Sequence, residues 1–221
     1  RRITAALNQL GERINHKTVQ RLMGVLGLKS TVRPKKYRSF KGDIGIAADN
    51  LLDRKFEADA PNQKWVTDVT EFNVDGDKLY LSPILDLYNG EIIAFETSRR
   101  PVFEMVGSMV KKALAKLRPG EAPMLHSDQG WQYRMPLYKT MLAARGMVQS
   151  MSRKGNCHDN AAMESFFAVL KSEYFYLKKF SSIEELQLGL SDYIRYYNDD
   201  RIKLKLSGLS PVQYRTQAMG G

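Results

Sequence analysis

Apolar residues recur at helical spacing twice in the first 28 residues of the chain. The two runs are Ile3, Ala6, Leu7 and Leu10, and then Val19, Leu22, Met23 and Leu26. Gly11 breaks the first run, Gly27 ends the second, and Asn15 is placed to cap the second helix. We therefore expect two short helices, arranged as a helix-turn-helix or as a plain helical hairpin.

From residue 63 onward, strand-like and helix-like runs alternate. Three strands are expected first, and the turns Asp75-Gly76-Asp77 and Asn89-Gly90 between them are hairpin signals. The expected strands are 64–72, 79–87, 91–98, 123–127 and 147–151, and the expected helices are 102–117, 135–145, 159–176 and 182–198. This is the element order of a ribonuclease-H-like α/β domain, in which helices flank a five-stranded mixed sheet.

The charge of the chain is concentrated near its start. The 221 residues carry a net charge of +10, and residues 1–41 contain 11 Lys or Arg but a single acid, Glu12. The remaining residues contain equal numbers of bases and acids. Such a dense basic segment is typical of proteins that bind DNA or RNA, although a solvated basic tail would have the same composition.

The cysteine and histidine content excludes several kinds of site. Cys157 is the single cysteine, so no internal disulfide can form. The three histidines do not fall at metal-ligand spacings, which excludes a zinc site of the usual kind. We find no signal peptide and no apolar run long enough to cross a bilayer, so a cytoplasmic protein is expected. The first residue is not methionine, which fits a fragment or a trimmed chain.

Three carboxylates stand out because of their local settings. Asp68 lies inside an apolar strand-like run, Asp128 closes another, and Glu164 lies early in a helix-like stretch. A charged residue inside a strand is costly unless it is paired or binds a cation. Two strand carboxylates and one helix carboxylate can converge on a pair of divalent metal ions, an arrangement suited to phosphoryl transfer on nucleic acid. Lys171, two helical turns after Glu164, would lie on the same helix face.

Each acid also has an ordinary explanation. Asp68 could lie on the surface of an edge strand, Asp128 could cap a turn, and Glu164 could favour the first turn of a helix because of the helix dipole. Two further acids are alternative candidates: Asp86, at the end of the second strand, and Asp159, which we expect to be a helix N-cap.

Several motifs together resemble one family, the bacterial insertion-sequence transposases with a retroviral-integrase-like core, and in particular their second-reading-frame (OrfB) products. The core motifs are WVTDVT (65–70), HSDQG (126–130) and GNCHDNAAMESFF (155–167). The 35 residues between Asp128 and Glu164 match the DDE spacing of that family. Further resemblance lies in NHKTVQRLM (15–23), YYN (196–198), RIKLKL (201–206) and GLSP (208–211).

The resemblance implies a chemistry and a division of the chain. Asp68, Asp128 and Glu164 match the catalytic, metal-binding acids of the family, and two Mg²⁺ or Mn²⁺ ions would be the cofactors. The reaction would be cleavage of insertion-sequence ends and transfer of the 3′-hydroxyl to target DNA. The expected segments are a DNA-binding helix-turn-helix (1–28), a basic linker (29–62), the catalytic core (63–178), and a C-terminal helix with a basic tail (179–221).

The implied partners are double-stranded DNA, as element ends and target, and further copies of the chain on that DNA. No membrane and no small-molecule substrate are expected, and the setting would be the bacterial nucleoid. A hydrolytic nuclease of the same fold and a catalytically silent DNA-binding regulator stay open as alternatives. The bases expected to contact DNA are Lys17, Arg21, Arg33, Lys35, Lys36, Arg153, Lys154, Lys171, Arg201, Lys203 and Lys205.

Overall fold

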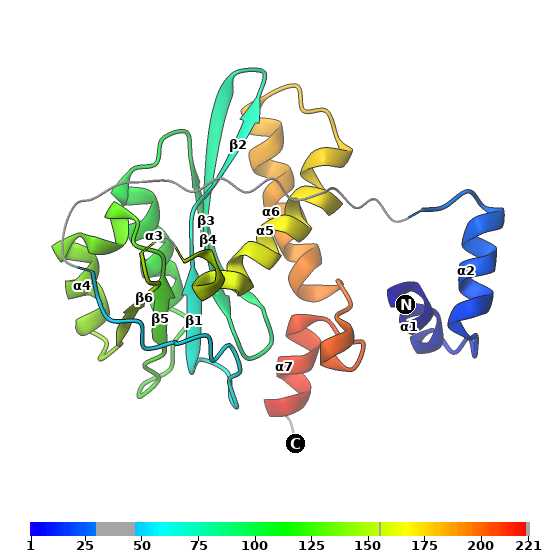
Figure 1. Ribbon diagram of the computed structural model, residues 1–221, viewed down its shortest axis with the longest axis horizontal. Coiled ribbons are helices and arrows are strands. Elements are labelled where there is room, and N and C mark those ends of the chain that lie inside the picture. The colour runs from blue at the N-terminus through cyan, green and yellow to red at the C-terminus, as the bar shows by residue number, and fades with distance from the viewer. Residues whose placement is uncertain (30–46, 155, 220–221) are drawn as a thin grey trace.

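A mixed β-sheet with helices on both faces forms the centre of the computed structural model, which describes residues 1–29, 47–154 and 156–219 (Figure 1). In the sheet, β1 pairs in parallel with β5 and β5 with β6, whereas β3 pairs antiparallel with β1, β2 and β4. The strands are β1 (Lys64–Thr67), β2 (Thr70–Val74), β3 (Asp77–Asp86), β4 (Ile92–Ser98), β5 (Met124–Ser127) and β6 (Gln149–Met151).

The expected first strand, 64–72, is one strand with a break at Asp68. Thr67 of β1 pairs with Ile84, and Thr70 of β2 pairs with Leu81, so both pieces keep one register against β3. That register sets Pro83 opposite Asp68, and proline has no N–H to donate to a ladder. The break divides one of the five predicted strands into two. It also releases the backbone next to Asp68 from strand pairing.

The helices cover the two faces of the sheet. On one face, α5 (Ala161–Glu173) and α6 (Ile183–Asp199) pack against the Val66 side of β1. On the other, α3 (Phe103–Leu114) and α4 (Pro136–Ala143) pack against its Trp65 side, since neighbouring strand residues point to opposite faces. The remaining elements of this part are η1 (Trp131–Arg134), η2 (Cys157–Asn160), η3 (Phe175–Leu177), η4 (Leu204–Leu206) and α7 (Pro211–Met219).

The segment before β1 also packs into the core. Leu52 is 1% exposed, and the backbone N–H groups of Leu51 and Leu52 donate to the Ser150 hydroxyl on β6, at 3.0 and 3.1 Å. Ala48 contacts the apolar cluster beneath the sheet. Residues 47–54, within the span expected as a basic linker, thus belong to the folded core, whereas residues 30–46 lie outside the described part.

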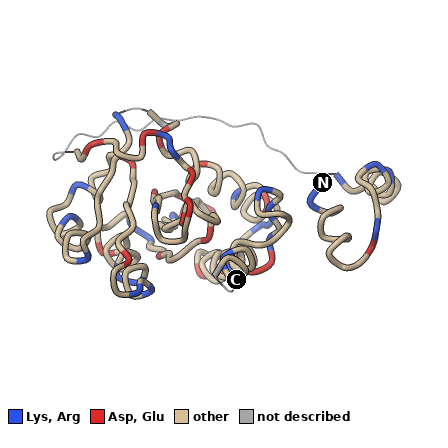
Figure 2. The backbone as a smooth tube through the Cα atoms, turned by 90° about the horizontal axis from the view of Figure 1, so that it is seen from below, with Lys and Arg blue, Asp and Glu red and all other residues tan. Residues whose placement is uncertain are grey.

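Two helices precede the core, as the spacing predicted: α1 (Arg2–Gln9) and α2 (His16–Val25). The Asn15 side chain accepts the Thr18 N–H at 2.9 Å, which confirms the predicted N-cap. Two contacts join α1 to the core: Arg2 pairs with Glu173, and Gln9 donates to the Gly208 carbonyl. Basic positions outnumber acidic ones along this two-helix unit, in which Glu12 is the single acid (Figure 2). No described helix has both the length and the apolar character needed to cross a membrane.

The start of α5 differs from the prediction. Asp159 was expected to cap this helix, but the N-cap residue is Asn160, and its side chain makes no capping bond. Asp159 instead turns into the core, where it is 0% exposed and accepts hydrogen bonds from Asn50, Arg54 and Arg153. Four hydrogen bonds to a buried carboxylate stabilise it more than one capping bond at the surface would.

Candidate active site

Two of the predicted acids lie next to one another because of the register of two parallel strands. Trp65 pairs with Leu125 and Val66 with His126, so the same offset sets Asp68 opposite Asp128. Each acid directly follows the last residue of its strand, at the carboxyl edge of the sheet. Adjacent strands lie about 4.8 Å apart, so the two side chains emerge side by side. Each accepts a local backbone N–H: Asp68 from Val69 at 2.7 Å, and Asp128 from Gly130 at 2.8 Å.

Glu164 reaches the same edge from the first turn of α5. The start of this helix is fixed to the end of β1 by Asn160, whose buried side-chain amide donates to the Thr67 carbonyl at 3.1 Å. Met163 and Phe167, on either side of Glu164 on the helix, are buried in the core, while Glu164 is partly exposed. Asn160 is thus a positioning residue. It lies within the 155–167 motif, but nothing in the sequence distinguishes it from the other polar residues there.

The electrostatics show that the acids share one neighbourhood. Burial raises the pKa of Asp68 well above its ordinary value, and the negative charges of Asp128 and Glu164 raise it further. Burial also raises the pKa of Asp128, against the opposing effects of the Gly130 N–H and the Arg134 charge. A bound cation would relieve the repulsion between carboxylates that lie close together in a partly buried site.

Lys171 follows Glu164 on α5 and lies close to the acids. Its ammonium group donates to the Glu71 carbonyl at 3.1 Å and lies 5.1 Å from the centre of the Phe72 ring. Burial lowers the pKa of Lys171, while the charges of Glu71 and Asp68 oppose that shift. The predicted cation is therefore within electrostatic reach of Asp68.

The donors at this edge are of the right kind for a hard divalent cation, because carboxylate oxygens are the ligands that Mg²⁺ and Mn²⁺ prefer. Within the described residues, no group of three His, Cys, Asp or Glu side chains is arranged so that it could hold an ion as it stands. The register brings Asp68 and Asp128 together, and Glu164 acts on Asp68 electrostatically. The residues fit a metal pair by chemistry, and the three carboxylates would have to come closer together to complete the ligand set.

A buried network beneath the site involves residues for which the sequence patterns predicted no such role. His126 bonds Ser150 through Nδ1 at 2.8 Å and Ser152 through Nε2 at 3.0 Å, and burial lowers its pKa to about 4. Burial alone would raise the pKa of Asp159, but the hydrogen bonds from Arg153 and Arg54 outweigh it and lower that pKa. These contacts fasten β5, β6 and the loop before α5 to one another, and so they hold Asp128 and Glu164 in place.

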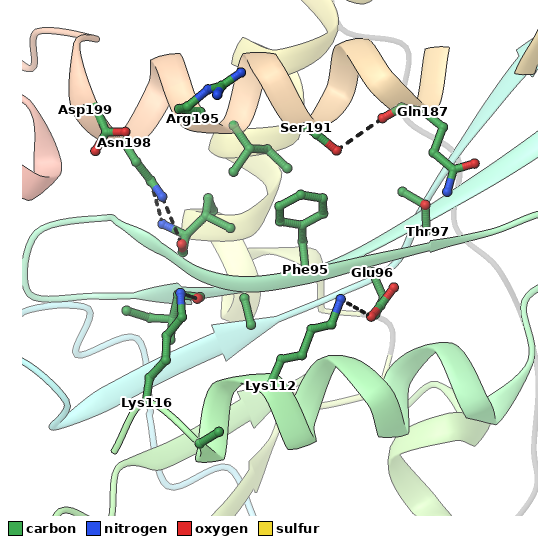
Figure 3. A pocket seen from close by; sticks show the side chains of 15 residues that line it. Phe95, Glu96, Thr97, Lys112, Lys116, Gln187, Ser191, Arg195, Asn198 and Asp199 are labelled. Atoms are coloured by element: carbon green, nitrogen blue, oxygen red, sulfur yellow. Dashed lines mark hydrogen bonds and ion pairs between the residues drawn. The ribbon is translucent and has the colours of Figure 1, made fainter. Parts of the chain in front are cut away.

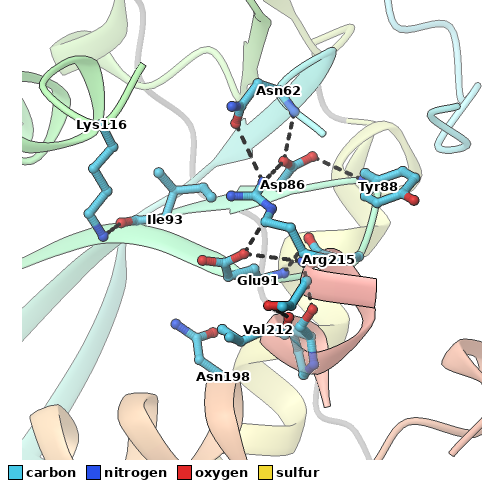
Figure 4. Close-up of polar contacts among 12 residues, drawn as sticks. Asn62, Asp86, Tyr88, Glu91, Ile93, Lys116, Asn198, Val212 and Arg215 are labelled. Atoms are coloured by element: carbon cyan, nitrogen blue, oxygen red, sulfur yellow. Dashed lines mark hydrogen bonds and ion pairs between the residues drawn. The ribbon is translucent and has the colours of Figure 1, made fainter. Parts of the chain in front are cut away.

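The other alternative acid, Asp86, has a structural partner (Figure 4). Its carboxylate is 0% exposed, pairs with Arg215 of α7 and accepts the N–H groups of Asn62 and Tyr88. Arg215 also pairs with Glu91 at 3.2 Å. The network joins α7 to the end of β3, where Asp86 pairs with Trp65 near the start of β1 and not with its carboxyl end. Asp86 therefore lies away from the edge that carries Asp68.

Apart from Lys171, described above, the bases expected to contact DNA divide into three groups. Arg33, Lys35 and Lys36 lie outside the described residues. Arg201 and Lys203 have partners inside the protein: Arg201 pairs with Glu173 through two bonds of 2.7 Å, and Lys203 donates to the Gly90 carbonyl at 3.0 Å. Burial lowers the pKa of Lys203 to about 7. The exposed members of the set are Lys17, Arg21, Arg153, Lys154 and Lys205, and Arg153 pairs with Asp53 and Asp159.

A hollow of about 750 Å³ lies on a different side of the core, along β4 between α3 and α6 (Figure 3). Lys112 pairs with Glu96 there, and the Asn198 amide exchanges two 2.9 Å hydrogen bonds with the backbone of Ile92. None of its lining residues is one of the three acids. The hollow is therefore separate from the candidate active site.

Comparisons with known proteins agree with this architecture. Two family models, each described as an integrase core domain, match residues 58–157 and 164–219, and an HTH-like domain matches residues 1–36. The catalytic core domain of HTLV-2 integrase in complex with magnesium superimposes with a TM-score of 0.57 and 16% identity, covering 71% of this chain and 97% of that one. That likeness confirms the ribonuclease-H-like, integrase-core fold.

Two relatives are far more similar in sequence. The putative transposase InsK for insertion sequence element IS150 of Escherichia coli is 57% identical, over 98% of this chain and 77% of that protein. An uncharacterized transposase-like protein of Haemophilus influenzae is 56% identical, over 94% of this chain and 95% of that protein. Because the identity is high and extends across the N-terminal helices and the core alike, the chain belongs to the insertion-sequence transposases with an integrase core domain.

Proposed function

We propose that this transposase cuts insertion-sequence ends and joins them to target DNA at a two-metal site formed by Asp68, Asp128 and Glu164. The observation that carries the proposal is the register of β1 and β5, which sets Asp68 beside Asp128 at the edge where Glu164 also acts on Asp68. Mg²⁺ or Mn²⁺, once bound, would activate the attacking oxygen and stabilise the leaving one. The three carboxylates would close around the ions, which offsets their mutual repulsion.

Both steps would be in-line displacements at phosphorus. In the first, a water oxygen bonds to the phosphorus at the element end, the bond to the 3′ oxygen breaks, and a 3′-hydroxyl is released. In the second, that hydroxyl attacks a target phosphodiester and displaces the 3′ oxygen of the target strand. The number of phosphodiester bonds is conserved in the second step, so no cofactor is consumed. Lys171 would neutralise a phosphate that flanks the reacting one.

DNA contacts outside the acids would come from the HTH-like unit. Lys17 and Arg21 are exposed on α2 and suit phosphates or base edges. We expect several copies of the chain to act together on DNA, because two ends of one element must be brought to one target. A simian T-cell lymphotropic virus intasome has a related fold, with a TM-score of 0.57 over 90% of this chain.

A strand-transfer assay tests the proposal. With a labelled element end, a target plasmid and Mg²⁺, the wild-type chain should give a joined product. Asp68→Asn and Glu164→Gln should keep DNA binding and lose joining by at least about 100-fold, the scale expected when an electrostatic contribution to the transition state is removed. Asp192→Asn, an exposed acid on α6, is the matched control and should join normally.

The same gel separates the alternatives. A nuclease of this fold would release the cut end without a joined product, and a silent regulator would bind the end and yield neither. Joining that persists in Asp68→Asn or Glu164→Gln would reject the assignment of the acids.

A further inference from the structure

The connection between α5 and α6 forms a second basic surface beyond the active-site edge. A hollow of about 600 Å³ opens between the turn of the β2–β3 hairpin and the residues that follow α5. Figure 1 shows the course of this hairpin and of the connection from α5 to α6. The lining of the hollow from the hairpin is Asn73, Val74 and Asp75, and from the connection it is Phe175, Tyr176, Lys178, Lys179 and Phe180. We call this the hairpin hollow.

Aromatic packing gives the hairpin hollow a firm base. The rings of Phe175 and Phe180 are stacked, with centres 5.7 Å apart and planes inclined by 12°. Phe175 also meets Phe72 of β2 edge-on at 5.0 Å. The connection is therefore held against the sheet, and the charged side chains that it carries start from fixed positions.

The cations at the rim are available to an external ligand. Lys178 and Lys179 are both exposed. The Lys178 ammonium lies over the Tyr174 ring, 4.9 Å from its centre, and within the described residues no ion pair involves Lys179. One carboxylate, that of Asp75, lines the opposite rim. The charge of Glu185 interacts with Lys178, but the two groups form no ion pair. Exposed ammonium groups that are not ion-paired suit the phosphates of DNA.

The hairpin hollow lies beyond the C-terminal end of α5, the helix that carries Glu164 in its first turn. Glu164, Lys171 and the end of α5 follow one another along the helix, and Lys171 and Phe175 both contact Phe72. The nine residues from Glu164 to the end of α5 span about 14 Å at 1.5 Å per residue, and the rim residues follow soon after the helix, so the rim lies roughly 15–20 Å from Glu164. Nucleotides of one DNA strand rise about 3.4 Å each, so that distance spans about five nucleotides.

We propose that Lys178 and Lys179, at the rim of the hairpin hollow, hold the phosphate backbone of duplex DNA about five nucleotides from the phosphate at the acids. The two lysines would contact phosphates and no base edges, so they would bind DNA of any sequence. It extends the proposed function, because it gives the DNA a second fixed point beyond Lys171 and thereby sets the direction in which the duplex leaves the active site.

The test compares DNA binding of the whole chain and its variants over a range of salt concentrations. The probe is a fluorescent duplex of mixed sequence, about 30 base pairs long. Each phosphate contact contributes about 0.9 to the slope of log affinity against log salt, so Lys178→Ala/Lys179→Ala should lower the slope by about 2. The matched control, Lys111→Ala/Lys112→Ala, changes two neighbouring lysines of α3 on the other face of the sheet.

Two further readouts sharpen the result. Asp75→Asn removes the carboxylate at the rim and should strengthen binding; asparagine also tolerates the positive φ of 49° at this position. Bound duplex should protect Lys178 and Lys179, but not Lys111 or Lys112, from chemical acetylation. A slope unchanged in the Lys178/Lys179 variant, or equal losses in variant and control, would overturn the proposal. Loss of joining in Asp68→Asn would still stand in that case, so the two proposals fail separately.

Discussion

Neutralising Asp68 should stabilise the metal-free protein while it abolishes joining. In the folded chain this carboxylate is partly buried and repelled by Asp128 and Glu164, which raises its pKa well above the ordinary value. Asparagine has nearly the same shape and no charge. Asp68→Asn therefore removes an unfavourable charge without opening a cavity, and we expect a higher melting temperature in EDTA.

The size of this stabilisation follows from the distance between Asp68 and Asp128, which the strand register sets. With adjacent strands about 4.8 Å apart, two unit charges about 5 Å apart at an effective dielectric constant of about 20 repel by about 3 kcal/mol. Partial exposure reduces this, and about 2 kcal/mol is a working value. For a chain of this size each kcal/mol shifts the melting temperature by about 2–4 °C, so the variant should melt about 4–8 °C higher.

The stability difference between Asp68→Asn and the wild-type chain should depend on pH in a definite direction. An acid whose pKa is raised on folding contributes stability at low pH that is lost as pH rises through the folded pKa. The advantage of Asp68→Asn should therefore be present at neutral pH and fade on acidification. Added Mg²⁺ should reverse the order, because ligand at about 100 times its Kd stabilises the wild-type chain by about 2.7 kcal/mol, whereas the variant lacks a ligand for it. Scanning calorimetry in EDTA and in Mg²⁺ measures both effects. An Asp68→Asn melting temperature in EDTA equal to or below that of the wild type would refute the reasoning.

The remaining predictions concern contacts that support the site. Asp159→Asn should lower stability by about 3 kcal/mol in urea unfolding, because Arg54 and Arg153 lose a buried charged partner; unchanged stability would contradict the role of the network. Burial alone would raise the pKa of Glu173, but the hydrogen bonds and charges of Arg201 and Arg2 lower it to about 2, so these ion pairs contribute stability above about pH 4.5 that is lost as pH falls toward 2. Arg201→Ala should cost about 2–3 kcal/mol at pH 7 and flatten the stability profile in that window, and an equally steep profile would count against the pair. Gly90→Ala should lower the free energy of unfolding more than Gly76→Ala, since both positions have positive φ but only a Cβ at Gly90 would clash with a neighbour, the Lys203 ammonium; equal unfolding free energies would refute this.

Patterns of neighbouring residues predicted the sheet well. Alternation and the turns at Asp75-Gly76 and Asn89-Gly90 gave the strands, and helical spacing gave α3 to α6 within a few residues. The break at Asp68 was hidden because its cause, Pro83, lies on the partner strand and matters only through the register. The separate helix α7 was not expected, since its hold on the core depends on Arg215 reaching Asp86, more than a hundred residues away.

The side-chain roles that the sequence did not reveal share a physical reason. The sequence led us to expect that Asp159 caps a helix and that Arg201 and Lys203 contact DNA, and it did not reveal the partners that these side chains have inside the protein. Their partners are remote: Arg54 for Asp159, Glu173 for Arg201, and the Gly90 carbonyl for Lys203. A buried charge takes the partner that folding brings to it, and single-sequence patterns do not contain that information.

The central claim is that Asp68, Asp128 and Glu164 together hold paired divalent ions. Anomalous X-ray diffraction from crystals grown with DNA and soaked in Mn²⁺ tests it most directly. We predict two peaks about 3.5–4 Å apart between the three carboxylates, with Asp68 touching both ions. Crystals in which Mn²⁺ saturates other sites, while the space between Asp68 and Asp128 shows no anomalous signal, would contradict the account.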